Sequence, residues 1–293
     1  MTAENTKQGL FARQALTDIE LADIKALADI CASYEDLDLR LSWSELRSRD
    51  SDVPGDLLYY EDGTLVGFLA LAGIGDREAE VAGMVHPRHR RQGVFTELVD
   101  EAREICRRRG TYTLLFVFDH RSDSARAFLA SIGAEHAFSE HRMQLDTPTA
   151  RSVPADAALD FKEAAPEDAG AIAQILADDA GMNAATLRSI ISCNIQERLR
   201  QYYIARVGGE PIGTINVDIV DGDPYIYGFV MRPEYRGRGY GRQILAQVIE
   251  RILDEGSPPV FIEVQTDNQV ALALYRSFGF VVTHTHDYYR LQT

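Results

Sequence analysis

The sequence of 293 residues predicts an α/β (α+β) fold built as two tandem copies of one domain, and three observations lead to this prediction. A Pro–Arg–Gly pattern occurs twice. An Ala–Gly pattern follows it in both halves at the same spacing. Helical and strand periodicities also alternate in a similar order along each half. The matched pairs, each 146 residues apart (233 minus 87 for the prolines), are Pro87 and Pro233, Arg90 and Arg236, Gly93 and Gly239, Ala125 and Ala271, and Gly133 and Gly279.

The repeat divides the chain into a first domain over 1–146, a linker over 147–160 and a second domain over 161–293. The linker segment contains two prolines and several small residues, and it has no apolar periodicity. These features are typical of a linker, although an ordinary surface loop shares them. The constant spacing of the repeat favours the linker.

The second domain is predicted to follow the order βααβββαβαββ. Acidic residues after Pro166 favour a helix N-terminus, and Gly208-Gly209 between two apolar runs predicts a hairpin turn. Apolar side chains at helical spacing predict the long helix after the repeated glycine. The predicted strands are 161–164, 202–207, 212–219, 225–231, 260–266, 280–283 and 288–291, and the predicted helices open at Pro166 and cover 184–199, 239–254 and 268–277.

The first domain follows the same plan with fewer recognisable elements. The segment Glu61-Asp62-Gly63-Thr64 predicts a hairpin turn between two apolar runs. The predicted strands are 57–60, 65–71, 80–85 and 113–118, and the predicted helices are 19–33, 93–108 and 124–132.

Composition excludes several classes of protein. The net charge of −15, with both halves acidic, argues against a nucleic-acid partner, because phosphate binding needs a positive field. No apolar run approaches the roughly 20 residues of a membrane helix, and no secretory signal opens the chain. The three well-separated cysteines, Cys31, Cys106 and Cys193, predict reduced thiols in a cytoplasmic protein without a metal site or disulfide framework. Nothing in the sequence indicates a particular oligomeric state.

The segment Arg236-Gly-Arg-Gly-Tyr-Gly241 lies between a predicted strand and a predicted helix. Its alternating glycines permit a tight turn with exposed backbone N–H groups, and the helix that follows adds unpaired N–H groups. Such a loop can hold a pyrophosphate, although it is also compatible with a simple turn carrying surface arginines. The spacing fits neither the dinucleotide-binding fingerprint nor the P-loop.

Two motifs in this half together resemble the GNAT N-acetyltransferases. Val230-Met-Arg-Pro233 followed by Arg236-x-x-Gly239-x-Gly241 resembles their acetyl-CoA loop, and Asn268 to Phe280 resembles their second signature. The resemblance covers residues 160–293 well and 10–146 more loosely. It implies two tandem GNAT-like domains, each a mixed, mostly antiparallel sheet flanked by helices, with acetyl-CoA as the acyl-donor substrate.

The resemblance also implies roles for individual residues. Phe229, Val230 and Met231 match the strand whose backbone pairs with the pantetheine amides. Asn268 matches the position that faces the cofactor arm, and Tyr275 matches the tyrosine near the thioester sulfur. The loop residues that match the pyrophosphate site, with the arginine that follows them, are Arg236, Gly237, Arg238, Gly239, Tyr240, Gly241 and Arg242.

Amine acylation needs a neutral amine and a proton for the departing thiolate. A tyrosine hydroxyl is protonated at neutral pH, so Tyr275 is the candidate acid; the alternative is a core aromatic without a catalytic role. Glu263, a carboxylate in an apolar strand, is the candidate base, and its alternative is a structural acid paired with a neighbour. The candidates for the acceptor pocket are Tyr225, Tyr227, Asn216 and Asp218, each of which is also compatible with packing. His284, His286 and Asp287 are interpreted as a solvated strand end.

The first domain departs from the pattern at the positions that carry chemistry. Residue by residue, Phe95 replaces Gly241, Leu129 replaces Tyr275, Val117 replaces Glu263, Ser122 replaces Asn268 and Arg91 replaces Gly237. We therefore hypothesise a degenerate first domain without catalysis. Arg88, Arg90 and Arg91 either hold a phosphate or form a solvated basic turn.

The sequence thus predicts an acyltransferase that moves the acetyl group of acetyl-CoA to a primary amine by direct attack in the second domain. A small-molecule amine is the expected acceptor. One alternative is a non-catalytic acyl-CoA sensor or scaffold. Another is a transferase that acetylates proteins or peptides.

Overall fold

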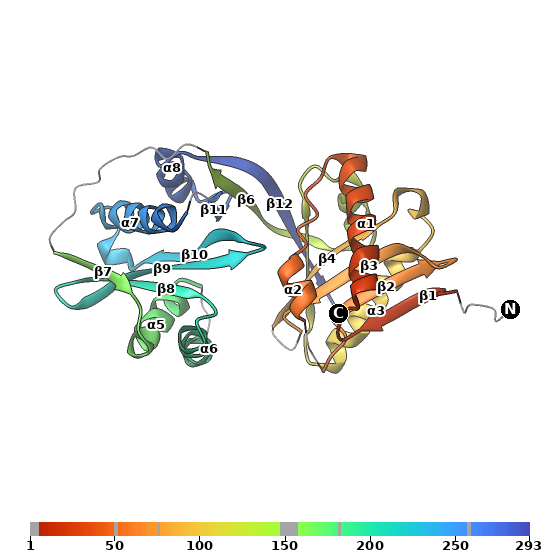
Figure 1. The fold of residues 1–293 in the computed structure, drawn as a ribbon, viewed down its shortest axis with the longest axis horizontal. Helices are drawn as coiled ribbons and strands as arrows, with labels where there is room; N and C mark the ends of the chain where they lie inside the picture. Colours follow the sequence, from red (N-terminus) through yellow and green to blue (C-terminus); the bar gives the residue numbers. More distant parts are fainter. Residues whose placement is uncertain (1–5, 50–51, 75–76, 147–157, 181–182, 257–258) are drawn as a thin grey trace. The chain divides into compact units, whose positions relative to one another are not determined.

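The computed structural model describes residues 6–49, 52–74, 77–146, 158–180, 183–256 and 259–293. The chain forms two compact units, the first of which is built from two separate segments of the chain (Figure 1). Unit 1 comprises Met1–Glu140 together with His284–Thr293, and unit 2 comprises His141–Thr283. Most of the expected linker lies outside the described residues, and its last two residues belong to the first strand of unit 2.

Unit 1 is a sheet with strand order β1-β2-β3-β4-β5-β12-β6, in which β4 and β5 run parallel and the pairs β1–β2, β2–β3, β3–β4 and β5–β12 run antiparallel. Its elements are β1 (Gly9–Arg13), α1 (Asp18–Glu35), α2 (Trp43–Ser48), β2 (Asp56–Glu61), β3 (Thr64–Ala72), β4 (Glu78–Val85), η1 (Pro87–His89), α3 (Val94–Arg108), β5 (Thr113–Asp119), α4 (Asp123–Ser131), the first part of β6 (Glu135–Leu145) and the last part of β12 (Phe280–Gln292).

The helices of unit 1 cover both faces of this sheet. On one face, α1 and α2 bury Ile24, Leu27 and Leu46 against β2 and β3. On the other face, α3 and α4 pack with Leu98 and Leu129 against a separate core. A capping box between Thr17 and Glu20, followed by an apolar stripe, explains where α1 begins.

Unit 2 repeats the arrangement with strand order β12-β6-β11-β10-β9-β8-β7, in which β10 and β11 are the parallel pair. Its own elements are β7 (Leu159–Glu163), η2 (Pro166–Asp168), α5 (Ala169–Ala180), α6 (Ala184–Gln196), β8 (Gln201–Val207), β9 (Glu210–Val220), β10 (Asp223–Met231), η3 (Pro233–Tyr235), α7 (Tyr240–Glu255), β11 (Phe261–Gln265) and α8 (Gln269–Ser277). Helices α7 and α8 cover one face, and α5 and α6 cover the other (Figure 1). The predicted α/β class and tandem organisation are confirmed.

The closing strands differ from the sequence prediction. The two short strands expected near the C-terminus are one continuous strand, β12, whose residues His286–Gln292 pair with β5 inside unit 1. In exchange, residues 141–145 of β6 belong to unit 2, where the Leu145 amide donates to the Val260 carbonyl (2.9 Å) and Met143 is fully buried. The units therefore differ from the expected segments 1–146 and 161–293, because each sheet is completed by a strand from the other half of the chain.

The expectation of a solvated end at His286 and Asp287 is wrong. Both side chains are buried in unit 1. The His286 Nε2 atom lies 3.0 Å from an Asp38 carboxylate oxygen, and Asp287 accepts a hydrogen bond from the Ser139 hydroxyl (2.7 Å). The prediction failed because it assumed that β12 ends at the edge of unit 2, whereas the strand continues into the interior of unit 1.

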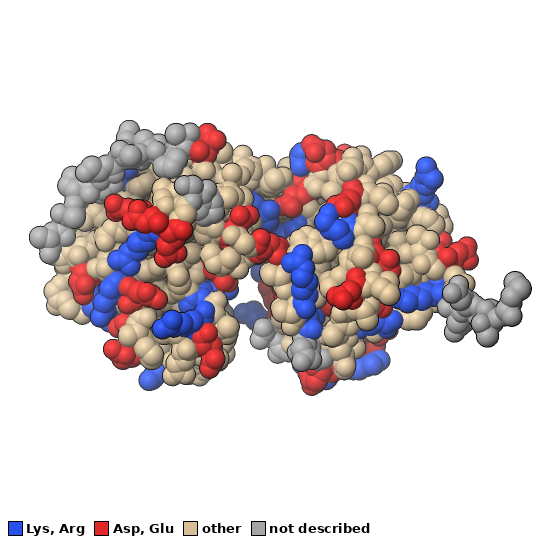
Figure 2. Space-filling model, in the orientation of Figure 1, with Lys and Arg blue, Asp and Glu red and all other residues tan. Residues whose placement is uncertain are grey.

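Acidic and basic side chains are interspersed over the face drawn in Figure 2, within a chain of net charge −15. In the described part of the chain, no helix is long and apolar enough to cross a membrane. Within the same residues, no group of three or more His, Cys, Asp or Glu side chains is arranged to hold a metal ion.

Candidate functional site

The parallel strands β10 and β11 separate part of the way along their length. Their register runs only from Tyr225↔Phe261 to Ile226↔Ile262, although β10 continues to Met231. On its other side, β10 shifts register against β9 between Tyr227 and Val230, so the strand bulges there. Gly228, at φ +52°, supplies the left-handed conformation that this bulge requires. A bulged strand that leaves its neighbour offers backbone groups to a ligand.

The loop after β10 leads into the N-terminus of α7. Gly237 and Gly239 have φ values of +75° and +87°, and Gly239 is the N-cap of the helix. A side chain would be strained at either position. The first backbone N–H groups of α7 begin at this loop, and the helix dipole makes the region attractive to an anion. The loop therefore has the local geometry of an anion site.

The two arginines of the loop, and Arg242 in the first turn of α7, each contact other parts of the protein. Arg236 donates to the Met231 carbonyl (2.8 Å) and to Asp179 of α5 (3.0 Å). The guanidinium groups of Arg238 and Arg242 lie 5.4 Å and 5.5 Å from the ring centres of Tyr235 and Phe278. Arg236 consequently ties the end of β10 to α5, a positioning contact that its place in the motif did not indicate.

Other predicted loop residues pack between the strand and α7. A Cβ added to Gly241 would lie 3.5 Å from the Phe229 ring, so that ring rests on the first turn of the helix. Tyr240 packs against the same core. On β10, Val230 is paired with Thr214 and Met231 with Gly213. The strand and the loop are thus joined directly.

Tyr275 lies on α8 with only 5% of its surface exposed, and its ring centre is 6.2 Å from that of Phe280. Burial raises the pKa of the Tyr275 phenol above its usual value. The phenol is therefore protonated at neutral pH, as a proton donor must be.

Asn268 is the N-cap of α8, where its side-chain oxygen accepts from the Ala271 amide (3.1 Å). Ser122 caps α4 of unit 1 in the same way by accepting from the Ala125 amide (3.2 Å). The change from Asn to Ser between the repeats therefore preserves a helix cap.

Polar and aromatic side chains gather on the face of unit 2 that α5 and α6 cover. Tyr225 stacks on Phe261 (4.9 Å between ring centres) and on Tyr227 (5.9 Å). Burial, the Glu263 carboxylate and Asp218, in that order, raise the pKa of the Tyr227 phenol above its usual value. Glu263 is therefore close to Tyr227, and the structure brings these sequence-predicted residues together.

Two arginines that the sequence did not indicate complete this face. Arg142 of β6 lies 3.6 Å from Glu263, and Arg200 donates to Asp218 (2.7 Å). Their guanidinium groups also lie over the rings of Tyr225 and Tyr227. No local signal reveals Arg142, because it enters unit 2 from a strand that precedes the unit's own elements in the chain.

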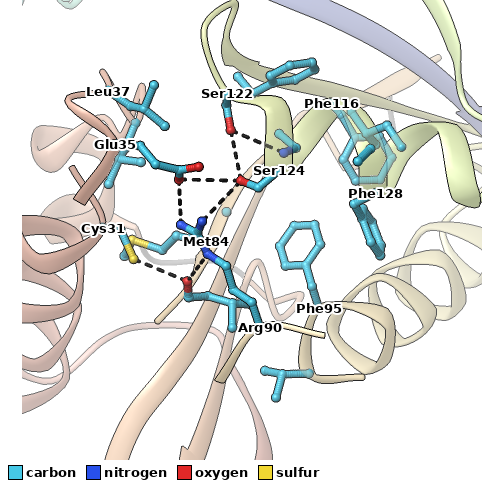
Figure 3. Close-up of a pocket in the computed structure, with 18 of the residues that line it drawn as sticks. Cys31, Glu35, Leu37, Met84, Arg90, Phe95, Phe116, Ser122, Ser124 and Phe128 are labelled. Atoms are coloured by element: carbon cyan, nitrogen blue, oxygen red, sulfur yellow. Dashed lines mark hydrogen bonds and ion pairs between the residues drawn. The ribbon is translucent and has the colours of Figure 1, made fainter. Parts of the chain in front are cut away.

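Unit 1 contains a cavity of about 450 Å³ at the corresponding place. The register of β4 and β5 ends at Val81↔Phe116, after which the strands separate as β10 and β11 do. Figure 3 shows Phe95, Phe116 and Phe128 at one side of the cavity and Cys31 and Met84 at the other. The cavity lies between the diverging strands, α1, α3 and α4, and its walls combine these apolar side chains with polar ones such as Glu35, Arg90 and Ser124.

The loop beside this cavity repeats the loop of unit 2 in its backbone angles. Gly93 has φ 89° and ψ −10°, whereas Gly239 has φ 87° and ψ −9°. Arg91 adopts φ +64° where unit 2 has a glycine. Arg90, like Arg236, binds the strand end and a carboxylate, donating to the Val85 carbonyl (3.2 Å) and pairing with Glu35 (2.8 Å, Figure 3). The loop fold is retained although its sequence has changed.

The two positions of unit 1 that match the candidate acid and base of unit 2 are apolar. Leu129 and Val117 are buried where unit 2 has Tyr275 and Glu263. The pairing of β3 with β4 also runs without a register shift from Gly67↔Val85 to Ala72↔Glu80. The described strands of unit 1 therefore lack the bulge that unit 2 has at Gly228.

Comparisons with known proteins agree with this architecture. The family model described as "Acetyltransferase (GNAT) family" matches residues 19–134 and 171–280. A mycothiol acetyltransferase of Streptomyces bingchenggensis is 29% identical over 274 residues, which is 85% of each chain. One of Streptomyces coelicolor is 26% identical over 81% of this chain and 79% of its own.

Solved structures show the same fold. A GCN5-related N-acetyltransferase from Sphaerobacter thermophilus superimposes with a TM-score of 0.79 at 22% identity, covering 97% of this chain and 95% of its own. A tandem GNAT protein from the clavulanic acid biosynthesis pathway has a TM-score of 0.72 at 20% identity and covers 97% and 98%.

Proposed function

Because the chain belongs to the acetyltransferase (GNAT) family and is an acyltransferase, we propose that unit 2 transfers the acetyl group of acetyl-CoA to a primary amine by direct attack. Unit 2 alone combines the bulged strand, the glycine loop and a buried tyrosine among the described residues. Unit 1 is, in this proposal, a GNAT-like unit without catalysis.

Acetyl-CoA is the acyl-donor substrate, and the residues present fit it. Its pyrophosphate suits the loop from Arg236 to Gly241, where the left-handed glycines open the backbone at the start of α7. The pantetheine arm suits Phe229–Met231, because β11 has left β10 there and backbone amide groups can pair with the arm instead. Arg242 and Asn268 shape the site through the Phe278 contact and the α8 cap.

The neutral amine attacks the thioester carbonyl, so a C–N bond forms and the C–S bond breaks. Glu263, directly or through water, receives the proton that the nitrogen loses, and the Tyr275 phenol gives a proton to the departing thiolate. The products are an N-acetyl amide and coenzyme A. Holding the two substrates together provides much of the acceleration.

The observation that carries this proposal is the buried, protonated phenol of Tyr275 on the unit that also has the open strand and loop. The acceptor is proposed to be a small molecule, since the relatives are mycothiol acetyltransferases. The similarity to these relatives covers most of both chains. It supports a small-molecule acceptor for this chain but does not identify that acceptor as the substrate of the relatives.

The test is release of free thiol from acetyl-CoA by the full chain with a panel of amines. The panel contains polyamines, amino acids, aminoglycosides, peptides and the amine precursor of mycothiol. We expect turnover with a small amine and its loss in Tyr275→Phe. Turnover with peptides but with none of the small amines would show that the acceptor is a peptide or a protein. Tight binding of acetyl-CoA without any turnover would favour the sensor instead.

A further inference from the structure

Asn216 on β9 carries a buried polar group that the protein leaves unused. Only 4% of the residue is exposed, and its side-chain oxygen Oδ1 has no hydrogen-bond partner within the described parts of the chain. A buried carbonyl without a partner costs free energy, and folding alone gives no reason to keep it. Such a group is expected where a ligand provides the missing donor.

The position of Asn216 fits the reacting end of the donor site. Asn216 pairs with Tyr202 on one side and with Tyr227 on the other, so the three side chains form a row on the face that α5 and α6 cover. The Tyr202 hydroxyl in this row already accepts from Asn194 (3.0 Å). Tyr227, the member of this row on β10, is the last residue before the bulge, which is followed by the proposed pantetheine-binding residues from Phe229.

Gly228 makes the room for this amide. A Cβ added to Gly228 would lie 2.5 Å from Asn216 Nδ2, closer than real atoms approach. The residue at the bulge is therefore a glycine for two reasons, its φ of +52° and the amide above it. The absence of a side chain at residue 228 leaves space for the Asn216 amide, whose oxygen has no partner among the described residues. This arrangement indicates a functional use for that amide.

The repeat provides an internal comparison. The residues 146 positions before Asn216 and Gly228 are Ala70 and Ala82. The two alanines face each other in an unshifted β3–β4 register. The unit whose tyrosine and glutamate are replaced by Leu129 and Val117 has thus also lost the amide and the bulge. The amide is therefore present only in the repeat that also has the candidate acid and base, as expected for a residue that contacts the substrate.

We propose that Asn216 Oδ1 accepts a hydrogen bond from the acceptor nitrogen and thereby selects primary amines; this inference rests on the function proposed above. A neutral primary amine has two N–H groups. One is held by Asn216, and the other is lost to Glu263 or water as the C–N bond forms. The product amide keeps the N–H that Asn216 holds. A secondary amine has one N–H and cannot satisfy both groups.

The experiment compares the full-length wild type with Asn216→Leu, which removes the carbonyl at similar volume. The probes are the best primary amine of the panel and its N-methyl derivative, with benzylamine and N-methylbenzylamine as a generic pair. Coenzyme A affinity and the melting temperature are measured on the same samples. Thr214→Val is the matched control, because this buried hydroxyl two residues earlier already donates to the Tyr203 carbonyl (2.9 Å).

We expect Asn216→Leu to raise the acceptor KM at least about tenfold and to bring the primary-to-secondary ratio of kcat/KM close to one. Coenzyme A affinity should stay unchanged, and the melting temperature should stay level or rise, because an unsatisfied polar group is removed. Thr214→Val should lower the melting temperature and preserve the ratio.

Three outcomes would overturn the inference. An Asn216→Leu protein that keeps the wild-type acceptor KM and selectivity contradicts the inference and leaves the proposed function intact. An Asn216→Leu protein that melts at a lower temperature and loses coenzyme A binding also contradicts the inference, because it shows a structural role for Asn216. A wild type that acetylates no amine rejects the proposed function, and this inference fails with it.

Discussion

The ring of Phe95 lies on the backbone of Gly83, so closely that a Cβ on Gly83 would be 2.8 Å from the ring. In unit 2 the pair is reversed, with Phe229 on the strand and Gly241 on the helix. Each unit therefore places one phenyl ring between the strand and the first turn of the following helix. The ring of Phe95, which replaces Gly241 in the repeat, lies against β4 and Phe128.

The two glycine N-caps allow a matched test of which loop holds the donor. Gly93 and Gly239 have nearly equal φ values, and no atom of the described residues lies within 4 Å of a Cβ added to either. Valine should strain the two loops equally. We expect Gly239→Val to weaken acetyl-CoA binding at least about 100-fold, or about 3 kcal/mol, and Gly93→Val to have a much smaller effect in calorimetry. Equal losses would contradict the assigned asymmetry.

Tyr275→Phe removes one oxygen from a residue that is otherwise held by core packing. We expect kcat to fall by ~100-fold or more, because the thiolate loses its proton donor, while the KM for acetyl-CoA changes little. Burial raises the phenol pKa, so the wild-type rate should show no loss from phenol ionisation up to pH 9. A variant with unchanged kcat, when chemistry limits the rate, would exclude Tyr275 from the mechanism.

Glu263→Gln separates the role of a base from that of an ion-pair partner. If Glu263 receives the amine proton, we expect kcat to fall by ~100-fold with only a small change in melting temperature. Arg142→Gln, which breaks the same 3.6 Å pair and keeps the carboxylate, is the control and should retain most of the activity. Equal losses in both variants would show that only the pair matters.

The exchanged strands predict that distant residues stabilise each unit. Leu291, near the C-terminus, is buried in the core of unit 1, and Met143 from the first half is buried in the core of unit 2. Leu291→Ala and Met143→Ala should each lower the free energy of unfolding by about 2–5 kcal/mol in urea titrations. The exposed Val281 of the same strand β12 is the control, and Val281→Ala should cost less than about 0.5 kcal/mol. A harmless Leu291→Ala would contradict the exchange.

The buried carboxyl group of Asp56 should make the free energy of unfolding depend on pH. Burial raises its pKa to about 6, although Arg49 is 3.2 Å away. Since the folded pKa is above the unfolded value of about 3.9, the folded state binds the proton more tightly. This contribution is complete below pH 4, is lost as the pH rises to 6, and amounts to about 3 kcal/mol. Asp56→Asn should therefore become more stable relative to wild type as the pH rises from 4 to 7 in urea unfolding. A difference that does not change with pH would contradict this.

The sequence by itself determined the repeat, the tandem α/β class, the glycine loop and the helices beside it. These features depend on residues close together in the chain, such as the glycine that opens α7 and the cap of α8. Local backbone preferences and apolar periodicity are sufficient to predict them.

Only the tertiary structure decided which strand closes each sheet, that Arg142 pairs with Glu263, and that the Oδ1 atom of Asn216 is buried without a hydrogen-bond partner among the described residues. Each of these depends on the pairing of segments far apart in the sequence. A strand pattern is equally compatible with several neighbours, and the choice among them is made by the packing of the complete cores.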